Sequence, residues 1–544
     1  MRPGQFLWLL RFRVFPRSRR PPYPAVVPTA CRLGTPFIEP PIQQDMATGV
    51  RLLGVEQRFV EGLPDWRAVD EAKLWRYNLH YFDYLLWPAV ADARKAALID
   101  SWIAQNPPGS PDAWEPYSVS LRIVNWVKFL VARGASSEVP AAWLESLGLQ
   151  AAWLERNLER EILANHYFKN AKALVFAGLF FQGPEADRWL GLGGRILKEE
   201  IREQFVPDGG HYELSPMYHC LCLEDLLDVW NLAQGSKRVL GREGLAEIEG
   251  AARRALDFLA AVLMPNDRIP LFNDSAFGIA PTPSALFSYA DALFGYQRPE
   301  EPPDALADSG YFRLGAGGDR MIIDCGPVSP SYQPGHTHCD MLSYELALDG
   351  RPIVVDTGVH DYEASAERAL SRATRAHNTV SVDGADQSEV WGVFRVARRA
   401  RPLVAELSSR GGQGARFGGE LEGFPGVAGR IRHRREVVYD SPSDWTIRDE
   451  VLGSGSHRVD SWIHLHPDLS AEKSGGSVLV TDQCDTVVAS IEILGGAGVS
   501  VEPGLYFPHF GTKRDNQVVR LTETGALPVR LGYRIRKGGG SRVS

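Results

Sequence analysis

Residues 299–326, PEEPPDALADSGYFRLGAGGDRMIIDCG, mark the point at which one kind of sequence pattern gives way to another. The Pro-rich segment 299–304 is typical of a linker, and short apolar runs such as 321–326 follow Gly310. Before this stretch the apolar residues recur with helical spacing. After it they fall in short segments separated by turn residues. The sequence therefore predicts a helical N-terminal half and an all-β C-terminal half.

The helical pattern is clearest in residues 118–134, SVSLRIVNWVKFLVARG. Ile123, Trp126 and Val127 have the i, i+3, i+4 spacing of one buried helix face, and Gly134 is a stop signal. Similar patterns predict about eight to ten helices and no strand in this half. Helical hairpins in such a run bury their faces only in a closed or solenoidal arrangement, and no fixed-period repeat is evident.

The C-terminal half contains about ten short strand patterns without helices between them. Asp349-Gly350 lies between two of these patterns and is a strong hairpin signal. Many short strands in succession favour stacked antiparallel sheets. We therefore expect an N-terminal extension over residues 1–60, a helical domain over 61–305, and an antiparallel β-sandwich over 306–544.

Composition excludes several classes of protein. The chain has 544 residues, 59 Lys and Arg against 67 Asp and Glu, and a formal net charge of −8. This balance argues against a nucleic-acid partner, although a local basic cleft can still bind an anionic substrate. No apolar run reaches the roughly 18 residues of a membrane-spanning helix. The six cysteines form no CxxC pair, so we expect free, mostly buried thiols.

The first 22 residues, MRPGQFLWLLRFRVFPRSRRPP, are basic and only briefly apolar. Their apolar run, 6–10, is broken by Arg11 and Arg13, whereas a secretory signal needs about 7–15 apolar residues. The segment is therefore a poor signal peptide, which favours a cytoplasmic location. A basic peripheral segment or a misplaced start is the simpler reading.

Two groups of polar residues lie in the helical half. Asn165, His166 and Asn170 share a helical pattern, with His166 and Asn170 one turn apart on one face. A buried, satisfied polar pair is the alternative reading. Ser215-Pro216 forms an N-cap and first-turn pair that places Tyr218 and His219 at a helix start.

The start of a helix favours anions, so it can lower the pKa of the Tyr218 phenol and suit it to proton transfer. The alternative is a tyrosine packed on the core, with its hydroxyl group solvated. The spacing does not decide between these two interpretations.

Two further groups lie in the β half. His336 and His338 alternate, which sends both rings to one face, as in many metal or acid-base sites. Asp356 closes an apolar strand and His377 opens the next one, and an unpaired buried carboxylate is costly. His338, Asp356 and His377 together form a zinc-binding set with one ligand missing. A surface histidine pair, an exposed turn aspartate and a capping histidine are the alternatives.

Arginines are dense between residues 368 and 401. A solvated charged face is the usual explanation, and a lining for a polyanion is the alternative, because the guanidinium binds carboxylate and sulfate groups bidentately. Aromatic residues near these groups could stack on sugar rings, although most aromatics at helical spacing belong to a core. The candidate substrate-binding residues are Arg122, Tyr117, Arg372, Arg375 and Trp391.

Seven stretches, in order between about residues 70 and 405, together make the chain resemble the heparinase II/III-like polysaccharide lyases, which include heparin, heparan and alginate lyases. The family architecture is an incomplete (α/α) toroid followed by an antiparallel β-sandwich, and the resemblance implies it here. The stretches are RYNLHYFDYL (76–85), PYSVSLRIVNW (116–126), NHYFKNAKAL (165–174), DGGHYELSPMYH (208–219), PGHTHCDMLSYEL (334–346), VVDTGVHDY (354–362) and RAHNTVSVDGADQSEVWGVFRVARRAR (375–401).

The resemblance also implies roles for individual residues. Asn165, with His166 beside it, would neutralise the carboxylate of a uronic acid. Tyr218, with His219 beside it, would be the catalytic tyrosine, and His336 the catalytic histidine. The zinc-ligand pattern of some family members falls on His338, Asp356 and His377, where a zinc ion would be structural. No organic cofactor is implied.

A lyase of this kind removes the C5 proton of a uronate and expels the group on O4. Hydrogen bonds to the carboxylate stabilise the enolate-like transition state, while a base and an acid transfer the protons. Tyr218 would be the acid in a syn or an anti elimination, and the base is left open among Tyr218, His219 and His336. The product would carry a C4–C5 double bond. Heparan-like, alginate-like and other uronate-bearing bacterial exopolysaccharides all remain candidate substrates.

Two other functions stay open. A non-catalytic polysaccharide-binding or biosynthesis-associated protein could retain the lyase fold. A toroidal glycoside hydrolase would need two carboxylates beside its cleft, for which Glu213 and Asp274 are candidates. The resemblance implies a periplasmic or secreted protein, against the cytoplasmic location favoured by the N-terminal segment. The sequence gives no indication of an oligomeric state.

Overall fold

The computed structural model describes residues 1–14, 24–134, 138–238, 240–409, 414–440 and 443–539, so residues 15–22 of the basic N-terminal segment lie outside the described part. The predicted boundary near residue 305 separates the main helices from the sheets, but two segments of the helical half, Val206–His219 and Asp257–Phe277, belong to the unit that contains the sheets. Tyr218 and His336 therefore share one unit. The helical unit comprises Met1–Phe205, Cys220–Leu256 and Gly278–Arg298, and the sheet unit comprises Val206–His219, Asp257–Phe277 and Pro299–Ser544.

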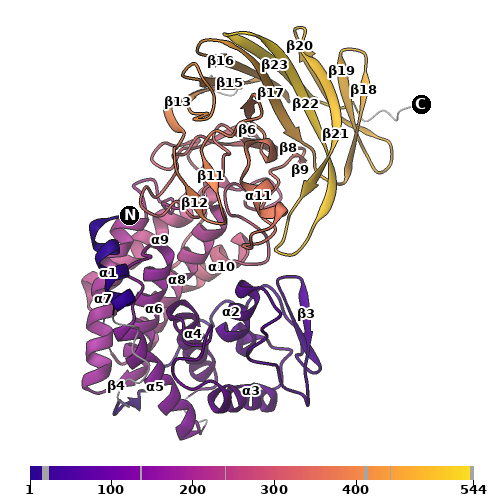
Figure 1. Cartoon of the computed structure of the whole chain (residues 1–544). Coiled ribbons are helices and arrows are strands. Elements are labelled where there is room, and N and C mark those ends of the chain that lie inside the picture. The colour runs from indigo at the N-terminus through magenta and orange to yellow at the C-terminus, as the bar shows by residue number, and fades with distance from the viewer. Residues whose placement is uncertain (15–23, 135–137, 239, 410–413, 441–442, 540–544) are drawn as a thin grey trace. The chain divides into compact units, whose positions relative to one another are not determined.

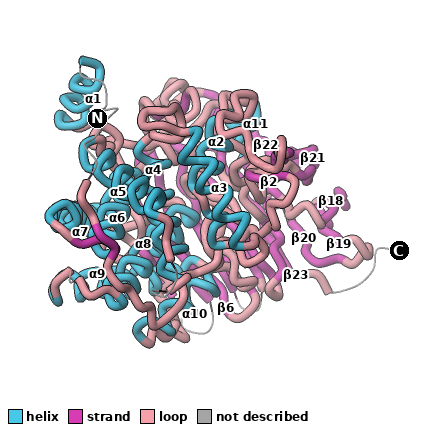
Figure 2. The backbone as a smooth tube through the Cα atoms, turned by 90° about the horizontal axis from the view of Figure 1, so that it is seen from below, coloured by secondary structure: helices cyan, strands magenta, loops and turns pink. Residues whose placement is uncertain are grey.

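Between residues 73 and 294 the described chain forms nine α-helices, coloured indigo to pink in Figure 1 and cyan in Figure 2. The predicted helix over 118–134 is confirmed, since Ile123, Trp126 and Val127 are all buried. The nine are α2 (Lys73–Tyr81), α3 (Asp92–Gln105), α4 (Pro116–Ala132), α5 (Ala141–Arg156), α6 (Ala164–Phe180), α7 (Pro184–Gln204), α8 (Pro216–Gly235), α9 (Arg242–Val262) and α10 (Pro283–Phe294).

Helix α6 is buried along nearly its whole length, polar residues such as Lys169 and Asn170 included, which identifies it as a central helix. It lies directly against α7. A Cβ at Gly178 would stand 2.6 Å from the backbone nitrogen of Leu190, and one at Gly193 would stand 2.9 Å from the carbonyl oxygen of Ala171. Glycine at these two positions therefore allows the helix backbones to approach.

The prediction of no strand in this half is wrong in detail. The extension contains a short helix, α1 (Pro3–Val14), and a two-stranded hairpin of β2 (Gly49–Leu52) and β3 (Val55–Arg58). Strand β1 (Val27–Pro28) pairs with β4 (Phe181–Gln182), which lies between α6 and α7. These strands are too short to show the alternation by which a strand is recognised in sequence.

Three antiparallel sheets of the sheet unit confirm the predicted all-β architecture. Asp349 and Gly350 both have positive φ, of 50° and 77°, as a two-residue hairpin turn requires. The first sheet is β5 (Ala305–Leu306), β6 (Tyr311–Ala316), β7 (Asp319–Asp324), β8 (Tyr344–Leu348) and β9 (Arg351–Val354) in that order. The second runs β13 (Arg401–Ser409), β14 (Gly414–Glu422), β15 (Arg432–Asp440), β16 (Asp444–Leu452), β23 (Val529–Lys537), β20 (Val487–Leu494), β19 (Ser477–Asp482) and β18 (Leu469–Ser474), and the third runs β10 (Val380–Val382), β17 (Ser456–His464), β22 (Arg514–Ala526) and β21 (Gly498–Tyr506).

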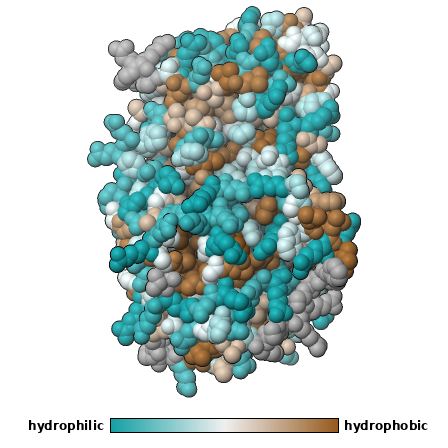
Figure 3. Space-filling model, turned by 90° about the vertical axis from the view of Figure 1, so that its left-hand side faces the viewer, coloured by the Kyte–Doolittle hydropathy of each residue, from teal (hydrophilic) through white to brown (hydrophobic). Residues whose placement is uncertain are grey.

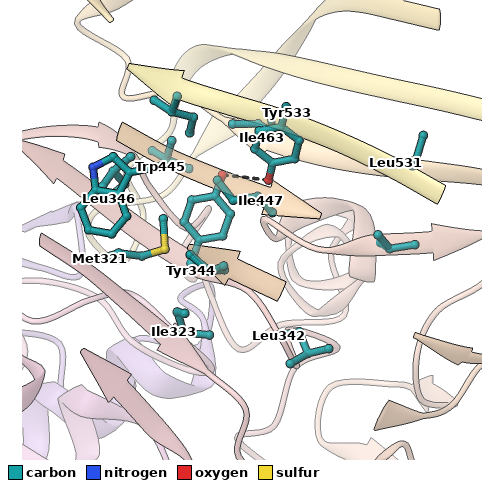
Figure 4. Close-up of a cluster of buried hydrophobic side chains, with 14 of the residues drawn as sticks. Met321, Ile323, Leu342, Tyr344, Leu346, Trp445, Ile447, Ile463, Leu531 and Tyr533 are labelled. Atoms are coloured by element: carbon teal, nitrogen blue, oxygen red, sulfur yellow. Dashed lines mark hydrogen bonds between the residues drawn. The ribbon is translucent and has the colours of Figure 1, made fainter. Parts of the chain in front are cut away.

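The core of the sheet unit is apolar with a few paired polar groups (Figure 4). Tyr344 and Tyr533 join their hydroxyl groups at 3.0 Å within it. Arg435 is fully buried, binds Asp449 through two nitrogens, and donates to the carbonyl oxygens of Leu342 and Asn378. This guanidinium therefore ties the core to the two segments that carry His338 and His377.

Hydrophilic side chains cover much of the face in Figure 3, with apolar groups between them. Exposed large apolar residues concentrate in α1 and in residues 391–404. No helix of the described residues is long and apolar enough to cross a membrane. The expected free thiols are confirmed, with five of them buried and Cys484 exposed.

Candidate active site

Tyr218 lies in the first turn of α8, where the sequence predicts a helix start. The Ser215 hydroxyl accepts the backbone N–H of Tyr218 at 3.2 Å, which confirms the predicted N-cap. The same hydroxyl donates to the carbonyl oxygen of Asp274 at 2.7 Å. The start of α8 is therefore fixed to the segment that carries Asp274.

The Tyr218 ring lies against His336, with ring centroids 4.0 Å apart, and its hydroxyl group is 3.3 Å from that of Tyr362. Burial raises the pKa of Tyr218 well above its usual range, and Tyr362, Asp274 and Glu213 raise it further. This direction is opposite to the lowering of the pKa expected from the helix start, and burial is its largest cause. A phenol in this setting stays protonated and suits proton donation.

His336 has carboxylates at both ring nitrogens. Nδ1 lies 2.8 Å from Asp274 Oδ2, and Nε2 lies 3.4 Å from Glu213 Oε2. The backbone N–H of Asp274 also donates to the carbonyl oxygen of His336 at 3.0 Å. Asp274 therefore fixes the ring through Nδ1, and Nε2, which has the looser contact with Glu213 at 3.4 Å, is the nitrogen left for proton transfer.

Asp274 is fully buried and is the centre of this arrangement. Besides His336, its carboxylate binds His338 Nε2 at 2.7 Å and both terminal nitrogens of Arg368. Burial alone would raise the pKa of Asp274, but Arg368 and the two imidazoles outweigh it and hold that pKa well below its usual range. Such a saturated carboxylate cannot serve as the acid or nucleophile of a hydrolase.

A second cluster beside Asp274 has the composition of a metal site. One ligand atom each of His338, Asp340 and His377 lies within 4.8 Å of the others, and all three residues are buried. The outer nitrogens are occupied, since His338 Nε2 binds Asp274 and His377 Nδ1 binds Asp356 Oδ2 at 2.8 Å. Within the described residues, His338 Nδ1 and His377 Nε2 are buried and have no hydrogen-bond partner.

The grouped atoms differ from the predicted ligand set, because Asp340 rather than Asp356 lies with His338 and His377, and the Asp356 carboxylate binds His377 Nδ1 instead. A carboxylate in that position is typical of the groups that orient metal-binding histidines. Burial lowers the pKa of His338 to about 4, so that imidazole is neutral, as a metal ligand must be. Sequence spacing could not show which aspartate belongs to the ligand group, because the positions of Asp340 and Asp356 relative to the two histidines depend on the fold.

Asn165, His166 and Asn170 lie in the helical unit. Asn165 is buried in the first turn of α6. His166 has a 30% exposed side chain, contacts the Tyr117 ring at 4.3 Å between centroids, and holds Glu159 Oε1 at 2.9 Å. Asn170 is fully buried and donates to the other oxygen of Glu159 at 2.9 Å, so it is the satisfied polar residue of the alternative reading.

Two predicted substrate contacts are wrong. Arg122 is fully buried, and its donors bind Gln150 and the carbonyl oxygens of His80 and Ala113. Arg372 is also buried and binds backbone carbonyl oxygens alone. An arginine with its donors used inside the fold is a structural residue, and sequence does not reveal that burial.

The other candidates are placed as follows. His219 is buried against Phe258 at 4.6 Å between ring centroids, and its Nδ1 accepts the backbone N–H of His211, so it supports the turn before α8. Arg375 and Trp391 are exposed and remain candidates for substrate binding.

Comparison with known proteins gives the family. Residues 91–293 match Heparinase II/III N-terminus, and residues 298–536 match Heparinase II/III-like, C-terminal. A toroid of helices with a β-sandwich, and a buried tyrosine in contact with a partly exposed histidine, define a protein of the polysaccharide-lyase type of fold. The chain belongs to the heparinase II/III family, as its motifs predict.

Individual relatives are distant. A heparin-sulfate lyase of Pedobacter heparinus is 27% identical over 57% of this chain and 52% of its own length. The chain spans 52–60% of three such lyases. FtsZ-localized protein C of Caulobacter vibrioides is 22% identical over 89% of this chain and 85% of its own. The crystal structure of a heparinase III superposes with a TM-score of 0.70 at 19% identity, covering 89% of this chain and 80% of the other, which confirms the predicted fold.

Proposed function

We propose that the protein is a polysaccharide lyase that cleaves a uronate-bearing glycan by β-elimination. The observation that carries the proposal is the contact between a phenol kept protonated by burial, Tyr218, and an imidazole fixed through Nδ1, His336. An acid and a base side by side suit a reaction that removes one proton and supplies another.

In this proposal Nε2 of His336 takes the C5 proton of the uronate. The electrons of the C5–H bond form the C4–C5 double bond as the C4–O4 bond breaks, and the Tyr218 hydroxyl gives its proton to O4. The proton that His336 took from C5 must then return to the phenolate, and Tyr362, whose hydroxyl group is 3.3 Å from that of Tyr218, is placed to relay a proton to it. This assigns the base among the residues that the sequence left open.

Asp274 has a supporting role in this chemistry. A carboxylate on Nδ1 selects the tautomer whose Nε2 lone pair faces the substrate and stabilises the imidazolium that forms. Arg368 keeps the carboxylate ionised by binding it through two nitrogens. Asn165 and His166, from the family resemblance, would neutralise the uronate carboxylate and so stabilise the enolate-like transition state.

A zinc ion fits the group formed by His338, Asp340 and His377. The two buried imidazole nitrogens without partners and one carboxylate are a common ligand set for this ion. When bound, the ion would supply a fixed positive charge that holds the segments around residues 338 and 377 together. The proton transfers themselves need only Tyr218 and His336.

The substrate class belongs to the same proposal. Heparan-like glycans are favoured by the curated relatives, while alginate-like and other uronate-bearing exopolysaccharides fit the same chemistry. Action outside the cytoplasm follows from the family resemblance, and cell fractionation tests it.

A non-catalytic polysaccharide-binding role is the second candidate. The observation in its favour is that FtsZ-localized protein C, whose name describes no lyase, matches most of both chains. The hydrolase alternative is disfavoured because the Asp274 carboxylate is saturated by three cationic or imidazole partners.

Ultraviolet absorbance of the unsaturated uronate product tests the proposal. Wild type and Tyr218→Phe are incubated with heparan sulfate, heparin, hyaluronan, chondroitin and alginate. We expect absorbance to rise with wild type on at least one glycan, and to fall by about a hundredfold or more in the variant at unchanged melting temperature. Release of reducing ends without absorbance would indicate hydrolysis, and binding without either would indicate the non-catalytic role.

A further inference from the structure

A small hairpin beside the active site exposes two aromatic rings. It consists of β11 (Val390–Trp391) and β12 (Arg395–Val396). Trp391 is 55% exposed and Phe394 is 43% exposed. Trp391 is the one exposed tryptophan among the described residues, although the chain has 14 tryptophans. Exposed aromatic rings gathered at one point indicate a contact surface.

Two buried arginines hold the backbone of this hairpin. Arg368 donates to the carbonyl oxygen of Val393 from Nε at 3.0 Å and from Nη2 at 2.9 Å. Arg372 donates to the carbonyl oxygens of Gly392 and Arg395, both at 3.1 Å. Two-residue strands are not stable alone, so these hydrogen bonds to the backbone are needed to hold the hairpin in place. Burying two guanidinium groups is costly unless their donors are bound, and the hairpin carbonyl oxygens bind several of them. Rigid presentation lowers the entropy lost on binding.

The exposed side chains of the hairpin match the chemistry of a charged sugar. The guanidinium of Arg395 lies 5.0 Å from the centre of the Trp391 ring, so an aromatic face and a cation stand together. An indole face attracts the C–H groups of a sugar ring, and a guanidinium binds a carboxylate or sulfate bidentately. Arg395 is itself exposed.

Ring contacts and shared hydrogen bonds also connect the hairpin to Tyr218 and His336. The Phe394 ring lies 6.2 Å from His336 and 5.2 Å from Tyr362, measured between centroids. The guanidinium of Arg368 that holds Val393 also holds Asp274, which in turn holds His336. One buried group therefore positions both the hairpin and the proposed base.

We infer that residues 390–396 form a binding subsite for the sugar unit next to the scissile bond, specific for a ring that carries a carboxylate or sulfate. Trp391 and Phe394 would contact the apolar face of the ring, and Arg395 would bind its anionic group. The inference deepens the proposed function, because it takes the ligand to be an anionic glycan.

The test measures the binding of oligosaccharides separately from catalysis. In the full chain with Tyr218→Phe, tryptophan emission and acrylamide quenching are followed during titration with hexasaccharides of heparan sulfate, alginate and, as neutral control, cellulose. We expect an anionic oligosaccharide to protect the exposed indole from quenching and cellulose to leave it unchanged. W391A and R395A, followed by calorimetry, should each weaken binding by about tenfold.

Arg530→Ala serves as the matched control, since Arg530 is an exposed arginine of β23 paired with Glu450. In the active enzyme, W391A and R395A should raise KM by about tenfold while changing kcat much less, and Arg530→Ala should change neither. Melting temperatures of all variants show whether the fold is kept.

Several results would overturn the subsite. These are unchanged affinity and KM in W391A and R395A, equal losses in Arg530→Ala, no protection of the indole by either anionic hexasaccharide, or stronger protection by an acidic peptide than by the glycans. Binding that depends on Trp391 in a protein without lyase activity would instead refute the proposed function and keep the subsite.

Discussion

Both units bury a cluster of charged groups, but the clusters differ in whether their side-chain nitrogens all have hydrogen-bond partners. In the helical unit, Lys128, Lys169 and Lys172 meet Asp225 and Asp228 at 2.6–2.8 Å, and every ammonium group has a carboxylate partner. Burial would lower the pKa of Lys172, yet the carboxylates outweigh it and raise that pKa, so the group is permanently charged. Each cation of this cluster is therefore neutralised by a carboxylate, which indicates a structural role.

The sheet unit pairs its buried carboxylates with imidazoles instead. Asp274 and Asp356 each bind one nitrogen of a histidine, and the second nitrogens of His338 and His377 stay without partners in the described structure. An imidazole has two separate nitrogens, so a carboxylate can fix the ring and leave the other nitrogen for a proton or a metal. Buried charge alone therefore does not mark a functional site, whereas two fixed rings whose unpartnered nitrogens lie together with a carboxylate, as in His338, His377 and Asp340, indicate one.

The largest expected effect is that of Asp274→Asn. The amide cannot enforce the tautomer of His336, so kcat should fall by about a thousandfold or more, as loss of an orienting carboxylate does in other His-dependent enzymes. The measurement is product absorbance against substrate concentration, with thermal melting as the control for folding. A kcat within threefold of wild type would show that Asp274 does not position the base.

A substitution in the lysine–aspartate cluster of the helical unit should change the stability of the protein rather than its activity. Asp228→Ala leaves two buried ammonium groups short of a carboxylate, which should lower the free energy of unfolding by about 3–5 kcal/mol. Urea denaturation measures this loss, and Asp187→Ala, which breaks an exposed ion pair with Arg238, is the matched control. Equal small losses in both variants would contradict the contrast between the units.

The zinc content of variants distinguishes the proposed roles of Asp340 and Asp356. His377→Ala and Asp340→Asn remove proposed ligands and should abolish stoichiometric zinc, whereas Asp356→Asn removes an orienting group and should weaken zinc binding by about 10–100-fold. Elemental analysis after dialysis and competition with a chromogenic chelator give these values. Zinc retained in Asp340→Asn but lost in Asp356→Asn would restore the ligand set expected from the sequence.

The smallest effect concerns a carboxylate of the helical unit that is bound by Gln204 at 2.6 Å rather than by an ammonium group. Burial raises the pKa of Glu200 to about 7 from its ordinary value of 4.5. Because the folded chain holds this proton more tightly than the unfolded chain, stability falls as the pH rises from 4.5 through about 7. Glu200→Gln should remove about 1–2 kcal/mol of that fall, as urea denaturation at pH 5 and pH 8 would show. Identical pH profiles would contradict it.

The fold could be predicted largely because its signals are local. The change of periodicity near residue 305, the cap at Ser215 and the turn at Asp349-Gly350 each depend on neighbouring residues, and the structure bears them out. The interleaving of the two units could not be predicted, since the segments at 206–219 and 257–277 join the sheets through contacts distant in sequence.

The main residues of the site could be predicted from the sequence, but the contacts between them could not. Tyr218 and His336 are marked by their motifs, but Asp274 meets His336 across 62 residues and Arg368 across 94. The available signal was an aspartate in the apolar segment 270–278, PLFNDSAFG, where an acidic group needs a partner. Arg122 and Arg372 show the converse error, because an arginine looks the same in sequence whether it faces a ligand or the core.

The hydrogen bonds that hold the hairpin end on main-chain oxygens of Gly392, Val393 and Arg395. Main-chain acceptors are present whatever side chains the hairpin carries. Evolution can therefore exchange residues 391, 394 and 395 without disturbing the support beneath them or the histidine that shares it. If the hairpin binds glycan as proposed, these three positions are the ones to randomise first when a new glycan preference is sought.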